Sequence, residues 1–341
     1  MAAMSTLAVS AAPALSAQAP IATQFERAVA YASRTDGEAV LVMHRGRIIR
    51  ERYLAGGSAS KVMMLASGSK SFVGVGALAA AADGLLRLDQ PAAELLPEWK
   101  SDAGKSRVTV RQLLSLEGGI ESGNPGTGCG GPRSTWADAV AAPSQVEPGT
   151  RFRYGPYPFT AIGAAIERVN SRESFDAYLE RRIFSPLGLK VAWRMTCGDG
   201  KPQLAGGAAM NARDWATFGD MIRRGGMHGS TRIVPADLVA QLFRPTSVNP
   251  AYGMSWWLRD AAFQTNPAMG AAGIGANGGA AKANADASSA DWLPRDLVMA
   301  AGAGKQRLYL IPSQELVVVR MGPVRGGRAF RDDEFLAALL R

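Results

Sequence analysis

The sequence contains very little histidine and cysteine. Its 341 residues include only His44, His228, Cys129 and Cys197 of these two types. Catalytic metal sites usually take two or three imidazoles, and a cysteine-rich zinc site needs more thiols than this chain has. The counts therefore predict no metal centre. A Ser-His-Asp hydrolase would need one of the two histidines, so an enzyme with this sequence is expected to move protons through other side chains.

Other absences narrow the class of protein further. The chain carries 38 basic and 29 acidic residues, but the basic residues form no runs and no stripe interleaved with aromatics. Nucleic-acid binding is therefore not expected. No segment after the N-terminus has about 18 unbroken apolar residues, so no membrane span is predicted. The P-loop, dinucleotide and G-x-S-x-G signatures are also absent, which predicts no nucleotide cofactor and no nucleophile elbow.

The N-terminal residues 1–23 are predicted to be a signal remnant or a disordered tail. Residues 4–19 are small and apolar and end in Ala-Gln-Ala, which suits a signal peptidase, although the first arginine is Arg27 and a basic start is missing. A signal predicts a periplasmic or secreted protein. In that oxidising compartment Cys129 and Cys197 could pair, but two free thiols fit the sequence equally well.

The apolar patterns place strands toward both ends of the chain and helices between them. Alternating or continuous apolar runs predict strands over residues 39–44, 47–54, 252–258, 308–311 and 315–320. Helical patterns cover residues 24–33, 67–84, 108–116, 158–169, 174–183, 212–225, 235–243 and 330–340. The Ala/Gly/Asn/Ser-rich residues 261–290 are predicted to form a long loop.

This order of elements predicts an α+β fold. The simplest architecture is one antiparallel sheet built from both chain ends, with the terminal helices on it and an all-helical lobe inserted between them. We expect residues 24–84 and 207–341 to form the α/β domain. Residues 85–206 are expected to form the helical domain.

A short motif at the head of the apolar helix carries the predicted chemistry. The S-x-x-K spacing puts Ser67 and Lys70 on one helical face, about one turn apart. A helix N-terminus favours negative charge on the serine oxygen, and burial would lower the lysine pKa so that a neutral amine takes the serine proton. The alternative is that Ser67 only caps the helix. A second match, Ser58 to Lys61, lies in a Gly/Ser loop without a helix start and is the weaker candidate.

Around this motif the sequence resembles the serine β-lactamase/penicillin-binding-protein superfamily. The segment LASGSKSFVGVGALAAAADGLLRLDQPAAELLPEW of this chain looks like the active-serine segment of that superfamily. Four further segments follow in the expected order, so that the resemblance spans about residues 37–322: VTVRQLLSLEGGI, EPGTRFRYGPYPFTAIGAAIERV, GGAAMNARDWATFGDMIRRGG and GAGKQRLYLIPSQELVVV. The closest branch holds class C β-lactamase-like hydrolases, family VIII esterases, D-aminopeptidases and 6-aminohexanoate-dimer hydrolases. The resemblance implies a β-lactamase/transpeptidase-like fold, an α/β sandwich plus an all-helical lobe.

The resemblance implies site residues but also shows two departures. Ser67 would be the acylated nucleophile and Lys70 its partner. The family's Tyr-x-Asn motif reads Tyr154-Gly155-Pro156, which keeps the tyrosine for a proton relay but replaces the asparagine that helps hold the substrate amide. Proline has neither a side-chain amide nor a backbone N–H. A phenolate at Tyr154 would need its pKa lowered from about 10 by the Lys70 cation and neighbouring dipoles.

The family's third motif, Lys-Thr-Gly or His-x-Gly on a strand beside the nucleophile, is also degenerate here. The matching residues 301–306 read AGAGKQ, with neither lysine nor histidine at the usual place. The backbone can still serve, because the N–H groups of Ala303 and Ser67 would form the oxyanion hole for a tetrahedral intermediate. The absent cation weakens the case for a substrate carboxylate bound as in penicillin recognition.

These observations predict a serine hydrolase that acts through an acyl-enzyme on a small-molecule carboxylic ester or amide. Ser67 attacks the carbonyl, and Lys70 and Tyr154 carry the proton. A weak β-lactamase or D-aminopeptidase belongs to the same hypothesis. The two altered motifs leave a second one open, a non-catalytic protein on the same fold that binds a small ligand or peptidoglycan. The sequence does not indicate the oligomeric state.

Overall fold

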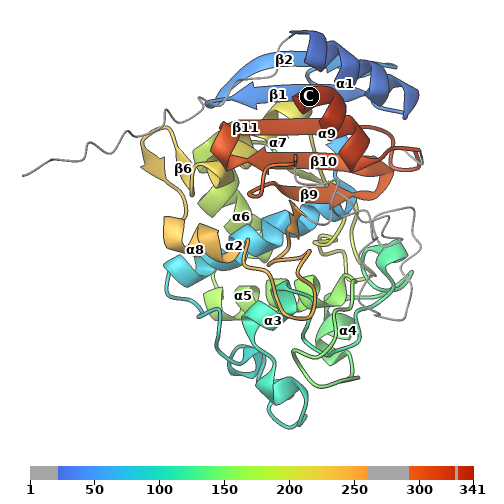
Figure 1. Cartoon of the computed structure of the whole chain (residues 1–341). Coiled ribbons are helices and arrows are strands. Elements are labelled where there is room, and N and C mark those ends of the chain that lie inside the picture. Colours follow the sequence, from blue (N-terminus) through green and yellow to red (C-terminus); the bar gives the residue numbers. More distant parts are fainter. Residues whose placement is uncertain (1–21, 260–291, 327–328) are drawn as a thin grey trace, which may run out of the picture.

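The computed structural model describes residues 22–259, 292–326 and 329–341. Its main element is a six-stranded antiparallel sheet with the order β2-β1-β11-β10-β9-β8. The strands are β1 (Ala39–His44), β2 (Arg47–Tyr53), β8 (Trp257–Leu258), β9 (Val298–Gly302), β10 (Gln306–Ile311) and β11 (Leu316–Met321). The first hairpin of the chain pairs directly with the last one, so both chain ends build one sheet (Figure 1).

Helices cover both faces of this sheet. Helices α1 (Ala22–Arg34) and α9 (Asp332–Leu340) pack on each other over one face, and α7 (Ala212–Arg223) packs on β1, β10 and β11 over the other. Every residue of β10 and β11 is therefore buried, which explains the apolar runs at residues 308–311 and 316–319. Gly219 lets α7 approach the sheet closely, because a Cβ there would lie 2.7 Å from Leu308.

The edge strand β2 is built differently from the central strands. Its side chains are alternately exposed and half-buried over most of its length, and its sequence RIIRERY includes three arginines. Charged side chains on an edge strand discourage pairing with the edge of another sheet.

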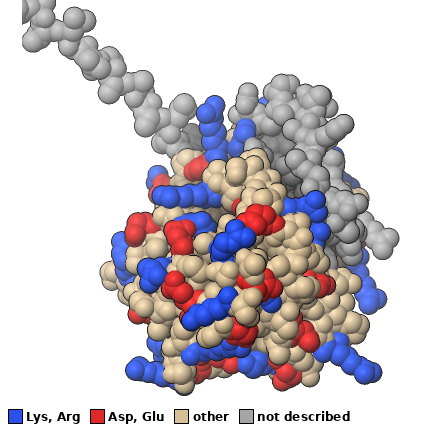
Figure 2. Space-filling view, turned by 90° about the horizontal axis from the view of Figure 1, so that it is seen from below, with Lys and Arg blue, Asp and Glu red and all other residues tan. Residues whose placement is uncertain are grey.

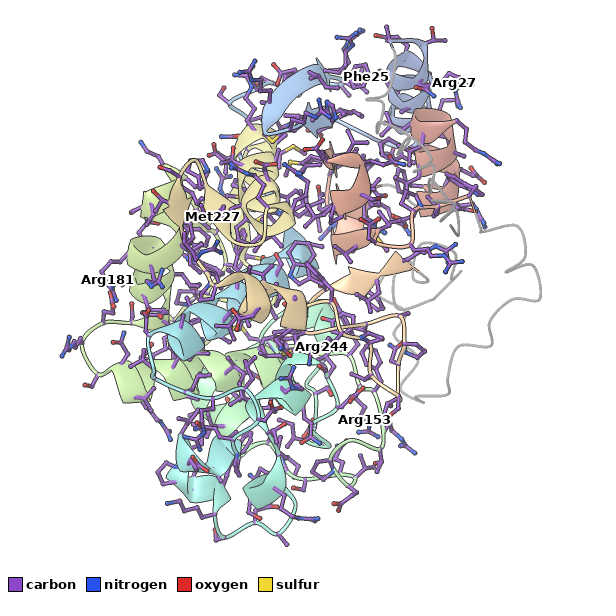
Figure 3. All side chains as sticks on the ribbon, turned by 60° about the vertical axis from the view of Figure 1, so that its left-hand side comes forward. Phe25, Arg27, Arg153, Arg181, Met227 and Arg244 are labelled. Carbon is purple, nitrogen blue, oxygen red and sulfur yellow. A yellow bond between two sulfur atoms is a disulfide. The ribbon has the colours of Figure 1, made fainter. Side chains whose placement is uncertain are left out.

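The middle of the chain is helical, as the sequence predicts. Helix α2 (Lys70–Ala82) is buried along its first eleven residues and packs against α5, α6 and α8. A helix that is apolar all round is expected in such a place. The surrounding helices include α3 (Val110–Leu114), α4 (Trp136–Ala141), α5 (Tyr157–Asn170), α6 (Phe175–Leu179) and α8 (Ala236–Gln241), most of them below the sheet in Figure 1. Side chains fill the space between these elements (Figure 3).

Several local features confirm the sequence predictions. Helix α3 lies within the predicted helix 108–116, and it begins with a capping box: the Thr109 side chain accepts from the Gln112 N–H, and the Gln112 side chain accepts from the Thr109 N–H. The hairpins at 39–53 and 306–321 lie where the apolar alternation places them. Cys129 and Cys197 form a disulfide, which decides between the two possibilities left open by the sequence.

Other predictions were wrong or fall outside the described residues. The predicted strand 252–258 shrinks to β8, because Gly253 packs against the backbone of Leu242 and Ser255 has a φ of +64°, so the chain turns before Trp257. Strand β9 was not predicted from its apolar pattern. Residues 1–21 of the predicted tail 1–23 and the whole predicted loop 261–290 lie outside the described residues, and residues 22 and 23 belong to α1.

Candidate active site

Ser67 lies in a tight turn that leads into α2. The turn is a 3₁₀ helix, Ala66–Ser69, and α2 begins at Lys70, so Ser67 precedes the helix and does not cap it. Ala66 has a φ of +47°, an unfavourable value for alanine. Such strain in a residue next to a reactive group is typical of functional sites, where the surrounding structure holds the backbone in place.

Lys70 is buried beside Ser67, on the next turn of the same segment. Its Nζ donates to Ser67 Oγ at 3.1 Å and to the backbone oxygen of Ala205 at 2.9 Å. It also lies over the Tyr154 ring, 4.7 Å from the centroid. Burial lowers the pKa of the Lys70 ammonium to about 7. A large fraction of neutral amine is therefore present near neutral pH, in contact with the serine hydroxyl.

Tyr154 completes the group from the loop before α5. Its ring stacks on Trp257 with 5.7 Å between centroids and 24° between planes, and Lys70 Nζ lies over the same ring. Burial raises the pKa of Tyr154 to about 12, although the neighbouring Ser67 side chain and the charge of Arg307 act in the opposite direction. A phenolate near neutral pH would need the pKa of Tyr154 to be lowered, so the shift is opposite to the one that it requires. Tyr154 is a neutral phenol that can both donate and accept a proton.

The end of β9 lies against the serine turn. A Cβ on Gly302 would come within 2.0 Å of the Leu65 oxygen and 3.1 Å of the Gly68 nitrogen, so only glycine permits this contact. Ala303 follows directly and opens the turn to β10. The chain thus brings Ala303 beside the segment of Ser67, although the two are far apart in sequence.

Pro156 stands at the N-cap position of α5 without a side-chain hydrogen bond, and its oxygen accepts from the Thr160 N–H. No side-chain amide is present where the resembling family has asparagine. The weaker motif, Ser58 to Lys61, lies elsewhere, since Lys61 forms an ion pair with Glu38. The histidines are also apart: His44 ends β1, and His228 lies in the short strand β6 (Met227–His228).

Sequence reasoning missed three partners of this site. The Ala205 oxygen that holds Lys70 is a backbone atom and has no sequence signature. Trp215 of α7 lies against Gly68, where a Cβ would come within 2.9 Å of its ring. Arg307, a buried residue of β10, had no role in the motif comparison. All three come from segments distant in sequence, so no local pattern points to them.

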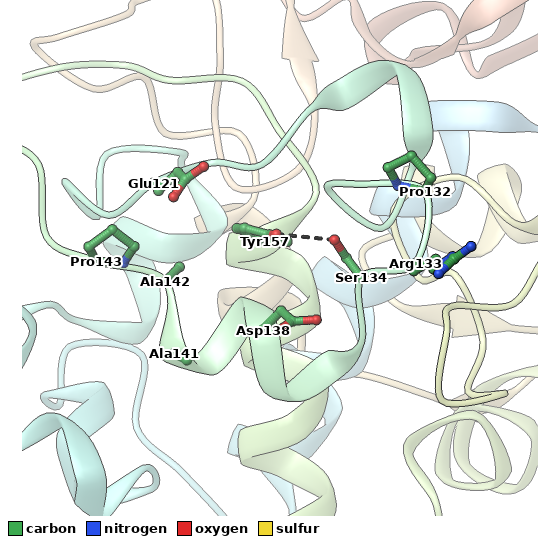
Figure 4. A pocket seen from close by; sticks show the side chains of 9 residues that line it. All are labelled: Glu121, Pro132, Arg133, Ser134, Asp138, Ala141, Ala142, Pro143 and Tyr157. Atoms are coloured by element: carbon green, nitrogen blue, oxygen red, sulfur yellow. Dashed lines mark hydrogen bonds between the residues drawn. The ribbon is translucent and has the colours of Figure 1, made fainter.

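A separate recess of about 460 Å³ lies beside α4 and the first turn of α5 (Figure 4). The hydroxyls of Ser134 and Tyr157 lie 3.3 Å apart within it. Its lining does not include Ser67 or Lys70 and consists of Glu121, Pro132, Arg133, Ser134, Asp138, Ala141, Ala142, Pro143 and Tyr157. We assign no role to this recess in the chemistry.

The surface in Figure 2 carries acidic and basic side chains next to each other. Many arginines are paired with carboxylates, for example Arg107 with Glu147 at 2.6 Å and Arg168 with Glu98 at 2.7 Å. Arg181, at the outside of the helical part in Figure 3, pairs with Glu173. Among the helices of the described ranges, none has the length and apolarity that crossing a bilayer requires.

The fold and the geometry define a class of protein, one with a half-buried serine and a buried lysine in an S-x-x-K turn between an antiparallel sheet and a group of helices. The family model for Beta-lactamase matches residues 22–340, so the chain belongs to the Beta-lactamase family. The chain therefore has the β-lactamase/transpeptidase-like fold of a family of serine hydrolases. The family and fold implied by the sequence resemblance are thus confirmed.

Solved structures with the same fold include a putative β-lactamase from Bacteroides dorei DSM 17855. It has a TM-score of 0.70 at 20% identity, over 94% of this chain and 99% of that one. A putative 6-aminohexanoate-dimer hydrolase from Bacillus anthracis matches with a TM-score of 0.67 at 18% identity, over 90% of this chain and 78% of that one. A family VIII carboxylesterase matches with a TM-score of 0.66 at 17% identity, over 94% and 98% of the two chains. No match was found among the curated proteins.

Proposed function

We propose that this protein hydrolyses a carboxylic ester or amide through an acyl-enzyme on Ser67. The observation that carries the proposal is the contact of Lys70 Nζ with Ser67 Oγ at 3.1 Å, made by a lysine whose pKa burial lowers to about 7. A neutral amine in contact with a hydroxyl can act as its general base. This arrangement needs no histidine, which fits a chain that has only two.

In the proposed first half-reaction, neutral Lys70 takes the proton of Ser67 Oγ as the oxygen bonds to the substrate carbonyl. The negative charge that develops on the carbonyl oxygen is held by the backbone N–H groups of Ser67 and Ala303. The carbon–leaving-group bond then breaks, and the leaving group takes a proton from the phenol of Tyr154. Lys70, now protonated, restores the proton of Tyr154. The contacts of Lys70 Nζ with Ser67 Oγ on one side and with the Tyr154 ring on the other support this relay.

In the second half-reaction, water attacks the acyl carbon and gives a proton to the neutral amine of Lys70. The bond to Ser67 Oγ breaks, and Lys70 returns the proton to the serine oxygen, directly or through the phenol of Tyr154, which takes one proton as it gives up its own. Lys70 Nζ lies 3.1 Å from that oxygen. The same residues therefore serve both steps in reverse roles.

Pro156 supports an ester as the substrate over a β-lactam. It offers no amide group to hold the substrate amide, and an ester does not need one. Among the solved structures of the same fold are a family VIII carboxylesterase and a D-stereospecific amidohydrolase from Streptomyces sp..

The decisive experiment compares the wild-type protein with Ser67→Ala and Ser58→Ala. A fluorophosphonate probe is expected to label the wild type and Ser58→Ala but not Ser67→Ala, and intact-protein mass spectrometry locates the adduct. Turnover is measured on short p-nitrophenyl esters, a chromogenic cephalosporin and D-amino-acid amides. Undiminished labelling of Ser67→Ala would overturn the proposal.

The second candidate is a non-catalytic protein on the same fold, favoured by the two altered motifs. It predicts no adduct and no turnover of any of these substrates, while a peptidoglycan fragment raises the melting temperature. The same set of proteins decides between the two candidates.

We also propose that the chain works in an oxidising compartment outside the cytoplasm. The disulfide between Cys129 and Cys197 supports this, because such bonds are rare where glutathione keeps thiols reduced. Fractionation of cells that express the full chain, followed by thiol labelling without reductant, tests it. Recovery of the protein in the cytoplasm with both thiols reactive would contradict it.

A further inference from the structure

Two arginines lie buried beneath the turn that joins β9 to β10. Arg307 of β10 and Arg320 of β11 face each other directly across the strand pair. Their exposed fractions are 1% and 0%. A buried charge is costly unless it is paired and hydrogen-bonded, so the contacts of these two side chains show what they hold.

Arg307 connects the C-terminal helix to the end of β9. Its Nε and Nη2 donate to the two carboxylate oxygens of Asp332 in α9 at 2.6 and 3.1 Å, and Tyr309 donates to the same carboxylate. The remaining nitrogen, Nη1, donates to the backbone oxygens of Gly302 at 3.2 Å and Gln306 at 3.0 Å. The fork to Asp332 therefore fixes the guanidinium and aims its third nitrogen at the two ends of the turn.

The Gly302 oxygen belongs to the same peptide unit as the Ala303 N–H. A peptide bond is a resonant amide, and a donor on its oxygen withdraws electron density from its nitrogen. Hydrogen bonds in such a chain strengthen one another, most of all when the donor is charged. Arg307 thus acts on the one amide of this turn that is proposed to hold the oxyanion.

We propose that Arg307 is a positioning residue that fixes and polarises the Gly302–Ala303 amide, which strengthens Ala303 N–H as an oxyanion donor. This inference rests on the proposed function. Its effect belongs to the tetrahedral state, because a full negative charge forms on the substrate oxygen only there. Loss of the contact is therefore expected to lower kcat and leave KM nearly unchanged.

Arg320 provides a matched control within the same turn. Its Nη1 donates to the backbone oxygens of Gly304 at 2.7 Å and Lys305 at 3.2 Å. The peptide unit of the Gly304 oxygen carries the Lys305 N–H, and that of the Lys305 oxygen carries the Gln306 N–H. Neither unit includes the Ala303 N–H. Both are buried arginines whose Nη1 donates to backbone oxygens of one turn, but Arg320 does not contact the Gly302 oxygen, and its Nη2 donates to the Thr35 oxygen where Arg307 pairs with Asp332.

The first test measures p-nitrophenyl ester hydrolysis by Arg307→Lys and Arg320→Lys. Lysine keeps the charge opposite Asp332 but cannot form the two-oxygen fork and reach Gly302 as well. We expect kcat of Arg307→Lys to fall about fivefold to tenfold with KM within twofold, a fraction of the roughly 10²–10³ that one lost oxyanion donor costs. Arg320→Lys is expected to lose thermal stability and to keep kcat within twofold. Equal kcat losses in the two variants, or none in Arg307→Lys, would overturn the inference.

The second test uses the wild-type protein, so it stands even if both variants fail to fold. A boronic acid that forms a tetrahedral adduct on Ser67 places a negative oxygen in the oxyanion hole. Because the coupling through the amide runs both ways, the guanidinium ¹⁵N resonances of Arg307 are expected to move when the adduct forms, and those of Arg320 to stay. An adduct that leaves the Arg307 resonances in place contradicts the inference. An adduct that also forms with Ser67→Ala contradicts the proposed function itself.

Discussion

At the scale of single residues, the site depends on how burial acts on two neighbouring groups. It moves the pKa of the Lys70 ammonium down to about 7 and that of the Tyr154 phenol up to about 12. Both shifts favour the neutral form, since burial disfavours charge of either sign. The pair is therefore uncharged over much of the range above neutral pH, a good state for accepting one proton and passing it on.

The first prediction concerns the pH dependence of acylation. The rate of fluorophosphonate labelling is expected to rise with pH through a midpoint at about 7, because the reactive form contains the neutral amine of Lys70. Labelling rates between pH 5 and pH 9 measure it. Tyr154→Phe serves as the control, which should lower the plateau and keep the midpoint. A rate that rises only near pH 10 would show that Lys70 keeps its ordinary pKa.

The second prediction concerns stability. Burial lowers the pKa of Lys70 from 10.5 to about 7, so the unfolded chain binds more protons between these values and the free energy of unfolding rises with pH there. At low pH the buried, charged Lys70 ammonium destabilises the folded protein by about 5 kcal/mol, as follows from the size of the pKa shift. Lys70→Met removes this destabilisation. The orphaned Ala205 oxygen and other lost contacts offset part of it.

We therefore expect Lys70→Met to be inactive but more stable at pH 6, by about 2 kcal/mol. The gain should shrink as the pH rises from 7 toward 10.5. Urea unfolding at several pH values measures it. A variant that is less stable than the wild type at pH 6 would refute this account of the lysine.

At the scale of elements, the site exists because the end of β9 meets the serine turn. Sequence reasoning found the turn and its helix, because Ser67, Lys70 and the apolar run behind them are adjacent in the chain. It could not find the meeting of Gly302 with Leu65, or of Trp215 with Gly68. Each of these contacts joins segments distant in sequence, and a glycine that is needed for close packing looks like any loop glycine.

The third prediction tests this meeting. Gly302→Ala would bring a Cβ within 2.0 Å of the Leu65 oxygen, so β9 must move away from the serine turn. We expect acylation of Ser67 to slow by about 100-fold, as when an oxyanion donor is lost. Stability should fall by about 1–3 kcal/mol from overpacking.

Gly126→Ala is the matched control, because the nearest atom to a Cβ there lies at 3.3 Å and its backbone is ordinary. It should keep both the labelling rate and the melting temperature. If Gly302→Ala acylates as fast as Gly126→Ala, the β9 end does not take part in the site.

At the scale of the whole molecule, the disulfide ties two parts of the helical region together. Cys129 and Cys197 are separated by 68 residues. Gln203 lies beside this bond and donates to the Thr127 oxygen, and its own segment leads to Ala205, which holds Lys70. The crosslink therefore supports the backbone on which the lysine depends.

The fourth prediction concerns the loss of this crosslink. Closing a loop of 68 residues removes unfolded-state entropy worth about 4 kcal/mol, so the double variant Cys129→Ser/Cys197→Ser should lose about 2–4 kcal/mol. Wild-type protein in reductant should unfold at the same urea concentration as this variant, which makes the two measurements controls for each other. An unchanged midpoint in both would contradict the prediction.

The pairing of β1 with β11 has a consequence for how the chain is made. Strand β1 can pair with β11 only after β11, the last strand of the sheet, has been synthesised. Contacts between such distant segments are slow to form, because closing the long loop between them costs entropy before the contacts contribute any stability. The sheet therefore stays open until β11 has left the ribosome. If the chain reaches the oxidising compartment proposed above, this delay would keep it unfolded, and so able to cross a membrane, until β11 has been made.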